Sequence, residues 1–98
     1  MTFTQDVYKL LKTIPNGKVT TYKHLAEALG TKAYRAVGSA MKNNCDLKNL
    51  PCFKVVKSDG SPGFYSKGKE EKIRRLKQEG IVVKNNKIIN FKKILWKP

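Results

Sequence analysis

The residue of this chain best suited to covalent chemistry is Cys52, which follows Pro51 and precedes an apolar run that ends at Val56. A thiolate is a strong nucleophile, but an ordinary cysteine has a pKa near ~8.5 and needs a nearby positive charge or base to ionise at neutral pH. The plainer alternative is a small buried hydrophobe. The other cysteine, Cys45, stands in a polar loop beside Asp46 and has little reason to ionise.

The sequence contains few residues that could bind a metal ion. Besides Cys45 and Cys52 it holds a single histidine, His24. An ordinary structural zinc site needs four cysteine or histidine ligands, so this set is too small. His24 is expected on the outer face of a helix, in solvent. We therefore expect neither a metal nor any other cofactor.

The charge of the chain indicates the kind of partner. Its 98 residues include 21 Lys and Arg against 7 Asp and Glu, for a formal net charge of +14. This excess favours a polyanion, either nucleic acid or an anionic membrane surface, although lysine-rich composition alone would also produce it. The chain has no apolar run of about 18 residues and no apolar signal core. We expect a cytoplasmic, intracellular protein with reduced cysteines that works on DNA and not at a membrane.

Helical periodicity dominates the first forty residues. Apolar side chains share one helical face between Phe3 and Ile14. After a short extended piece a second helix should begin at a Thr21 cap and end at Gly30. Its expected inward residues are Leu25, Ala28 and Leu29. A third helix follows, capped by Thr31, and its expected inward residues are Ala33, Ala36, Val37, Ala40 and Met41.

The second and third of these helices, with a tight glycine turn between them, match a helix-turn-helix. The outer face of the third helix carries Arg35, Ser39 and Lys42 at positions i, i+4 and i+7. In DNA-binding proteins of this kind the second helix of the pair enters a groove, so these side chains would meet DNA. Helix pairs also occur as plain packing units, and the pattern alone leaves both interpretations open.

Short β elements and one more helix complete the pattern. Residues 53–56 are apolar enough for a short strand or a buried extended run. A charged helix should run from about Gly68 to Gln78, with Ile73 and Leu76 facing inward. Two strands, 81–83 and 87–89, are joined at Asn85-Asn86, a pair that tolerates the positive φ angles of a tight hairpin.

These elements predict a mainly α fold with small β elements, similar to a winged helix-turn-helix. A chain of this length supports one modest core. We find no internal repeat and no Gly/Ser linker. Residues 1–98 are therefore expected to form a single domain, without a separate N-terminal domain, that acts as a monomer.

Several separated blocks of this sequence, in order and spacing, resemble the DNA-binding domain of the O6-alkylguanine-DNA alkyltransferases. The blocks are residues 14–22, 35–41, Asn44, 51–56 and 63–66. Members of that family transfer an alkyl group irreversibly from O6 of guanine to a cysteine, which here would be Cys52. One protein molecule is consumed per lesion. The resemblance implies double-stranded DNA containing O6-alkylguanine as the partner, with O4-alkylthymine as a further substrate.

The resemblance also implies roles in base flipping. The target nucleotide must leave the stack to reach a buried cysteine, which costs free energy. Arg35 would enter the duplex in its place, Tyr22 would crowd the target phosphate, and the neighbouring DNA contacts would come from Ser39 and Lys42. The plainer alternatives are a phosphate contact for Arg35 and core packing for Tyr22.

The pocket residues follow from the same resemblance. Asn44 would tie the helix-turn-helix to the active-site loop, Tyr65 would form an apolar wall, and the backbone at Ser66 would donate a hydrogen bond to O6. Gly63 would let the loop approach the base, unless it is simply a turn glycine. The remaining expected pocket residues are Pro51 and Val55.

The block around the cysteine departs from the family pattern. Most relatives carry Pro-Cys-His-Arg where this chain has Pro-Cys-Phe-Lys, so Phe53 replaces a histidine. In those relatives the histidine, oriented by a glutamate whose counterpart is Glu79, takes the cysteine proton through a water. Phenylalanine cannot accept a proton. Three compensations stay open: Glu79 acting through an extra water, thiolate stabilisation by Lys54 or Lys72 and the general positive field, or a lower rate.

Two other functions stay open beside transfer. The alkyltransferase-like proteins are non-enzymatic sensors that flip alkylguanine and recruit other factors, but they usually hold Trp or another unreactive residue where this chain has Cys52. A plain winged helix-turn-helix regulator would instead bind a palindromic site and make the cysteine block coincidental. The presence of Cys52 favours transfer.

Overall fold

The computed structural model describes residues 3–43, 50–63, 65 and 67–98. Three residues singled out above, Asn44, Cys45 and Ser66, lie outside this part of the chain. The element order is α1 (Phe3–Leu11), β1 (Thr20–Thr21), α2 (Tyr22–Ala28), α3 (Tyr34–Lys42), the 3-10 turn η1 (Cys52–Lys54), β2 (Val55–Val56), α4 (Lys69–Gln78), β3 (Val83–Lys84), β4 (Lys87–Ile88) and α5 (Phe91–Ile94). The fold is mainly helical with small sheets and is winged-helix-like, as the sequence predicts.

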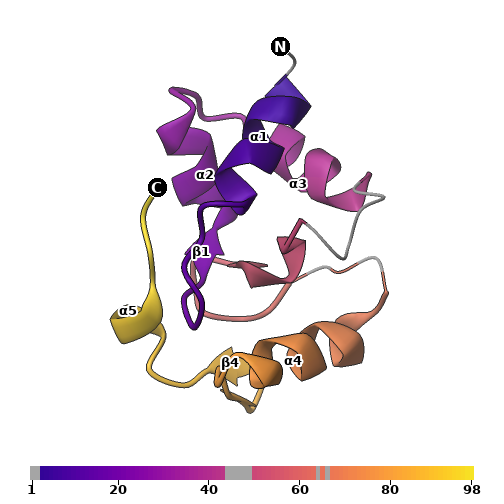
Figure 1. Cartoon of the computed structure of the whole chain (residues 1–98), viewed down its shortest axis with the longest axis vertical. Helices are drawn as coiled ribbons and strands as arrows, with labels where there is room; N and C mark the ends of the chain where they lie inside the picture. Colours follow the sequence, from indigo (N-terminus) through magenta and orange to yellow (C-terminus); the bar gives the residue numbers. More distant parts are fainter. Residues whose placement is uncertain (1–2, 44–49, 64, 66) are drawn as a thin grey trace.

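Helices α1, α2 and α3 form one end of the molecule, while α4, α5 and the β3–β4 hairpin form the other (Figure 1). The helical end is held by a shared apolar core to which α1 contributes Val7 and Leu11. Tyr8 of α1 also donates a hydrogen bond to the carbonyl of Ala40 in α3, at 2.9 Å. Helices α1 and α2 therefore support α3, whose outer face is exposed to solvent.

The helix-turn-helix forms where it was predicted, but one inward-facing residue of α2 and the cap of α3 differ from the prediction. Thr21 caps α2 by accepting a hydrogen bond from the backbone of His24, as expected. Ala26 is buried beside Leu25, whereas Ala28, which was predicted to face inward, is exposed. Thr31 does not cap α3, because its hydroxyl accepts from Ala33 and the helix begins only at Tyr34.

Two residues predicted to face inward on α3 are exposed. Ala33 precedes the first helical residue, and Ala36 lies beside Arg35 on the outer face. The inner stripe is Val37, Ala40 and Met41, which follows the i, i+3, i+4 spacing of a helix face.

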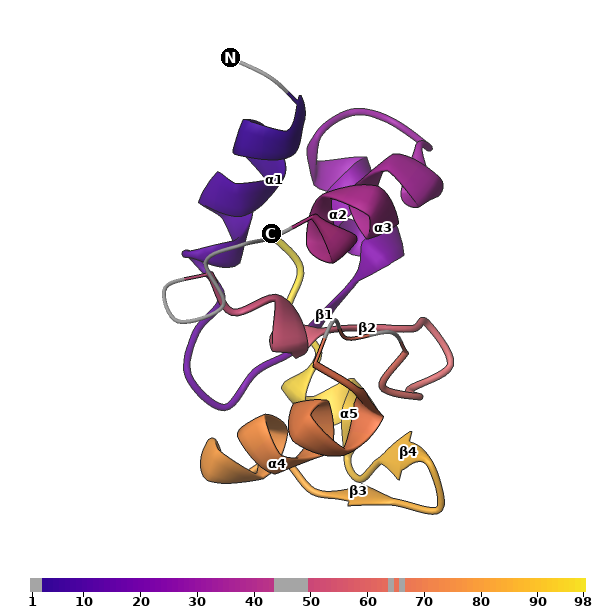
Figure 2. The same ribbon diagram turned by 90° about the vertical axis from the view of Figure 1, so that its right-hand side faces the viewer.

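A small parallel sheet joins the two ends of the molecule. Thr20 pairs with Val55 and Thr21 with Val56, so β2 lies beside the start of α2 (Figure 2). The predicted extended run 53–56 is only half correct, because Cys52–Lys54 forms a 3-10 turn closed by a hydrogen bond from Lys54 to the carbonyl of Pro51. Pro51 has no N–H for a ladder, which favours a turn at this point.

The second core lies beneath this sheet. Its buried residues are Val19, Val56, Leu76, Ile81 and Ile88. The predicted hairpin is present, with Asn85 at φ 53° and Asn86 at φ 61°. Its first strand begins at Val83 instead of Ile81, because the N–H of Ile81 closes α4 by donating to Leu76. The chain after α5 returns to Val19, whose carbonyl accepts from Trp96 at 2.7 Å.

Helix α4 spans the predicted segment but buries a different residue. Leu76 faces inward as expected, whereas Ile73 is only partly buried and Lys72 is fully buried. Within the described residues no helix is both long and apolar enough to cross a membrane.

Candidate active site and nucleic-acid interface

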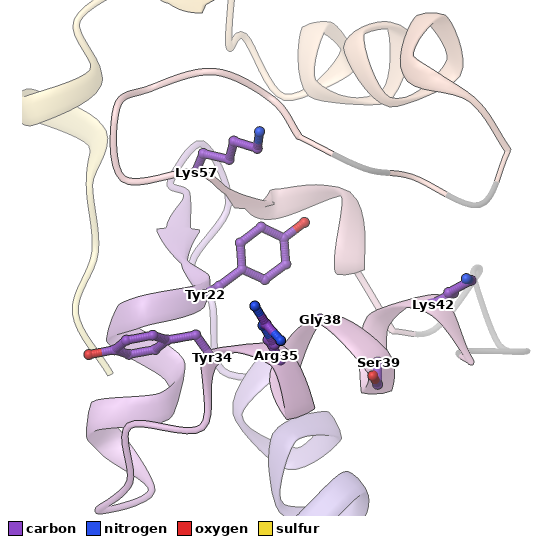
Figure 3. Close-up of a pocket in the computed structure, with 7 residues that line it drawn as sticks. All are labelled: Tyr22, Tyr34, Arg35, Gly38, Ser39, Lys42 and Lys57. Carbon is purple, nitrogen blue, oxygen red and sulfur yellow. The ribbon is translucent and has the colours of Figure 1, made fainter.

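A hollow of about 440 Å³ opens between α2, α3 and the segment that follows β2. The side chain of Tyr22 stands between Arg35 of α3 and Lys57 (Figure 3). All four residues predicted to bind DNA lie here. The lining residues are Tyr22, Tyr34, Arg35, Gly38, Ser39, Lys42 and Lys57.

This hollow is electrostatically suited to an anion. Arg35, Lys42 and Lys57 are exposed around it, and none of the described residues that line it is acidic. A concave surface with charges of one sign concentrates its field and raises the local concentration of a phosphate backbone. The sequence reading missed Tyr34 and Lys57, although Lys57 is the first polar residue after the buried β2 strand and so had to emerge at the surface.

Gly63 lies in a turn next to the hollow, and its predicted approach to the base stays a prediction. Its φ of +76° belongs to the left-handed region, so it is a turn glycine. It also approaches the hollow closely, because a Cβ at this position would stand 3.3 Å from Lys57 and 3.5 Å from the hydroxyl of Tyr22. A side chain here would be strained by the positive φ, and its Cβ would contact Lys57 and Tyr22.

Cys52 lies at the start of η1 and is 5% exposed. Its N–H donates to the carbonyl of Leu50 at 2.8 Å. Its charge acts on three neighbouring titratable side chains, which come from three different segments. These are Tyr22, Tyr65 and Lys72. The candidate nucleophile is thus coupled to side chains of three segments, and one of these side chains, Tyr22, also lines the hollow.

Both tyrosines stay protonated around Cys52. Burial, reinforced by the negative charge of Cys52, raises the pKa of Tyr22 to about 12. Burial also raises the pKa of Tyr65, against the opposing positive charge of Arg75. The Tyr65 side chain is buried as the predicted wall requires, and its hydroxyl has no hydrogen-bond partner among the described residues. Each phenol can therefore donate a hydrogen bond at neutral pH.

Glu79, the predicted relay carboxylate, has other partners in this structure. Its Oε1 accepts from the N–H of Gly17 at 2.9 Å and pairs with Nζ of Lys54 at 2.8 Å. Lys54 donates in addition to the carbonyl of Pro15 at 2.6 Å. This cluster fastens the loop after α1 to η1 and to the end of α4.

Of the two lysines proposed as thiolate partners, Lys72 is the one whose charge couples to Cys52. Burial lowers the pKa of Lys72 to about 7, and the negative charge of Cys52 opposes that shift. Lys54 is instead paired with Glu79. Of the other predicted pocket residues, Pro51 is partly buried and Val55 fully buried, beside Cys52 at the two ends of η1.

His24 takes no part in this arrangement. It is partly buried rather than fully solvated, and its Nδ1 lies 3.0 Å from the hydroxyl of Thr21. Burial lowers its pKa. Across the described residues no cluster of three or more His, Cys, Asp or Glu side chains could hold a metal ion.

A helix-turn-helix whose outer helix borders a basic hollow, with a cysteine behind it, defines a DNA-binding domain. The chain belongs to the family described as "6-O-methylguanine DNA methyltransferase, DNA binding domain", whose model matches residues 2–81. This is the family that the sequence blocks resemble.

Curated relatives support the same family. A bifunctional methyltransferase/endonuclease of Picrophilus torridus is 54% identical over 83 residues, which cover 84% of this chain and 28% of that protein. A methylated-DNA–protein-cysteine methyltransferase of Metallosphaera sedula is 44% identical over 82 residues, which cover 84% of this chain and 51% of that protein. The chain thus spans between about a quarter and about half the length of these relatives.

Solved structures match the fold. S. pombe Atl1 in complex with damaged DNA containing O6-carboxymethylguanine has a TM-score of 0.83 and 32% identity, covering 98% of this chain and 95% of that one. The O6-methylguanine-DNA methyltransferase of Pyrococcus kodakaraensis has a TM-score of 0.70 and 45% identity, covering 82% and 47%.

Proposed function

We propose that this protein repairs DNA by transferring the alkyl group of O6-alkylguanine irreversibly to Cys52, in a single turnover and without a cofactor. The observation that carries the proposal is the position of Cys52, which is buried in the core with Val55 and Tyr65. Its charge acts on the buried Lys72 and on Tyr22, a residue that lines the basic hollow. A merely structural cysteine has no need of a buried lysine beside it. We further propose that the protein acts as a monomer on double-stranded DNA.

The residues that line the hollow would contact the DNA duplex. Arg35 would fill the space left by the flipped nucleotide, and Tyr22 would press on its phosphate from within the hollow. Ser39 and Lys42, farther along α3, would hold the neighbouring backbone. Their common position on the lining of one hollow supports these roles.

The predicted pocket residues would bind the flipped guanine base. Tyr65 would form the apolar wall, Gly63 would let the loop pass close to the guanine, and the Ser66 backbone would donate to O6. Asn44 would join the helix-turn-helix to the loop. The roles of Asn44 and Ser66 rest on the family resemblance, since both residues lie outside the described part of the chain.

The transfer itself is a displacement at carbon. The Cys52 thiolate attacks the alkyl carbon, a sulfur–carbon bond forms, and the bond from that carbon to O6 breaks. The electron pair of the broken bond stays on the guanine, which then takes up a proton. A thioether is a poor leaving group at neutral pH, so the alkylated protein cannot turn over.

Intact-protein mass spectrometry tests this proposal. Wild-type protein incubated with duplex DNA carrying O6-methylguanine should gain the mass of one methyl group in place of one hydrogen, whereas the same duplex with unmodified guanine should leave it unchanged. Cys52→Ala should abolish the gain. An unchanged wild-type mass after complete binding of the lesion duplex would refute transfer.

A second candidate function, lesion recognition without transfer, is favoured by one observation. The match to Atl1 extends over nearly the whole chain, including the tail beyond residue 81 that the family model does not cover. Lesion-dependent binding with no change in mass would support this sensor function. Methyl transfer to Cys52 would exclude it as the sole role.

A further inference from the structure

Lys72 is the buried residue of this fold that the reading of the sequence did not foresee. Its side chain is 0% exposed, although it lies in the charged helix α4. Nζ donates to the carbonyl of Val55 at 2.7 Å and stands 6.0 Å from the centroid of the Tyr22 ring. A buried ammonium is costly, so a lysine in such a place tends to lose its proton or to face a negative charge.

The charged groups around this position identify that negative charge. On α4 itself, Glu71 is bound to Arg74 and Arg75. From η1 and the end of α4, Lys54 and Glu79 are paired with each other. Geometry brings Lys72 to Cys52, because Nζ donates to the carbonyl of Val55 directly after the turn that Cys52 begins, and the charge of Cys52 acts on Lys72.

Two phenols complete the surroundings. Tyr22 reaches Lys72 from α2, and Tyr65 lies on the segment before α4 beneath Arg75, whose guanidinium stands 5.8 Å from its ring centroid. Both phenols keep their protons at neutral pH because burial raises the pKa of each. Cys52 and Lys72 are therefore the two groups here that can exchange a proton near pH 7.

We propose that Cys52 and Lys72 form a proton-sharing pair in which the Lys72 amine accepts the thiol proton and so replaces the base that is missing at Phe53. This inference rests on the proposed function and names a further residue for it. It also explains why α4 buries a lysine where an apolar residue would ordinarily fill the core.

The protonation state of the pair suits the transfer of a proton from Cys52 to Lys72. Burial lowers the pKa of Lys72 to about 7, so a large share of the amine is unprotonated at neutral pH and able to accept a proton. Once Cys52 is a thiolate, its charge favours the ammonium form of Lys72. The two groups titrate together, and their midpoints belong to the pair rather than to either residue.

The proton balance closes over the whole transfer. The Sγ–H proton moves to Nζ of Lys72, leaving a thiolate and an ammonium. The thiolate takes the alkyl group, and the guanine leaves with the electron pair of the broken bond. The ammonium, which has lost its counter-charge, returns its proton to the departing guanine, so that Lys72 ends as a neutral amine beside a neutral thioether.

Alkylation of Cys52 by iodoacetamide tests the pair without DNA. The rate is followed between pH 6 and 9 by peptide mass mapping, which separates Cys52 from Cys45. Lys72→Met keeps the length of the side chain without its amine, and Lys77→Met is the matched control because it removes an exposed charge from the same helix.

In the wild type and in Lys77→Met we expect a midpoint below the ~8.5 of an ordinary thiol. Lys72→Met should move the midpoint to that value or above and slow alkylation at pH 7 at least about tenfold, the effect of one pH unit. Profiles of Lys72→Met and Lys77→Met that coincide would overturn the proposal. Adding Phe53→His to Lys72→Met should restore part of the rate, which a purely structural role of Lys72 would not allow.

A second measurement keeps Lys72 in place and therefore tests the proposal even if Lys72→Met does not fold. The ultraviolet absorbance of the thiolate, taken as the difference between wild type and Cys52→Ala, should titrate below ~8.5. A midpoint at or above that value would overturn the proposal. Because neither measurement uses DNA, loss of the pair and failure of the proposed methyl transfer can be told apart.

Discussion

Two lysines are buried in this domain, Lys54 at the end of η1 and Lys72 in α4, and their surroundings differ. Lys54, 2% exposed, is paired with the carboxylate of Glu79 and donates to backbone carbonyls of the loop after α1. Lys72, 0% exposed, donates to the carbonyl of Val55, faces the ring of Tyr22 and is coupled to the charge of Cys52. Burial of the same side chain thus has two different outcomes within one small domain.

The difference lies in the acidity of the partner. Lys54 is bound by a carboxylate and by two backbone carbonyls, so this ion pair acts as a structural fastening. A thiol ionises near neutral pH only with help, so a lysine beside it can share its proton. We therefore assign Lys54 and Glu79 to the support of the site, and Lys72 to the chemistry of Cys52.

The largest expected effect is on the supporting pair. Glu79→Gln leaves the Lys54 ammonium buried without its counter-ion, and breaking a buried ion pair on one side costs about 3–5 kcal/mol. The free energy of unfolding, from urea denaturation at pH 7, should fall accordingly. Glu70→Gln, at an exposed position of α4, is the control and should change little. Unchanged stability of Glu79→Gln with lost methyl transfer would make Glu79 the relay after all.

A smaller effect distinguishes the second lysine. Between pH 7 and 8.5 an unfolded chain keeps both the Lys72 and the Cys52 proton, while the folded pair keeps one, because burial lowers the pKa of Lys72 to about 7. The unfolded state then binds more protons, so stability rises with pH by up to about 1.4 kcal/mol per unit and falls again as pH is lowered toward 7.

Urea denaturation across that pH range checks this sign. The slope should be present in the wild type and in Lys77→Met, and it should disappear in Lys72→Met, where the remaining thiol keeps its proton in both states. At pH 7 Lys72→Met should be at least as stable as the wild type, since it removes a buried amine. A large loss of stability at pH 7 would mean that Lys72, like Lys54, is a structural fastening.

The smallest effect concerns the missing histidine. If Lys72 already accepts the proton of Cys52, then Phe53→His adds a second base to a site that has one, and single-turnover methyl transfer should accelerate less than about tenfold. In the Lys72→Met background the same change should accelerate transfer more, because general-base help is worth ~10²–10⁴-fold where it is otherwise lacking. Equal acceleration in both backgrounds would argue that Lys72 does not act on Cys52.

The fold could be predicted from local signals because they were strong. Thr21 as a cap, the Asn85-Asn86 turn and the outward set of Arg35, Ser39 and Lys42 all follow from spacing and turn chemistry. The 3-10 turn at Cys52 could not be distinguished from a strand, since both suit a short apolar run after a proline.

The two buried lysines were harder to foresee. Lys72 precedes Leu76 by one helical turn and so shares its inward face, a signal present in the sequence but outweighed by the charged residues around it. The pairing of Lys54 with Glu79 joins residues 25 positions apart, and that contact depends on how α4 packs beneath η1. Local periodicity holds no information on such a contact.

The most direct test of the account is the pH dependence of methyl transfer itself. Single-turnover transfer from O6-methylguanine duplex DNA is followed for wild type and Lys72→Met from pH 6 to 9 by the mass of the Cys52 peptide. The account predicts that both proteins methylate Cys52, that Lys72→Met is at least about tenfold slower at pH 7, and that its rate approaches the wild-type rate as the pH rises toward 9. An unmodified Cys52 in the wild type, or two profiles that coincide, would contradict it.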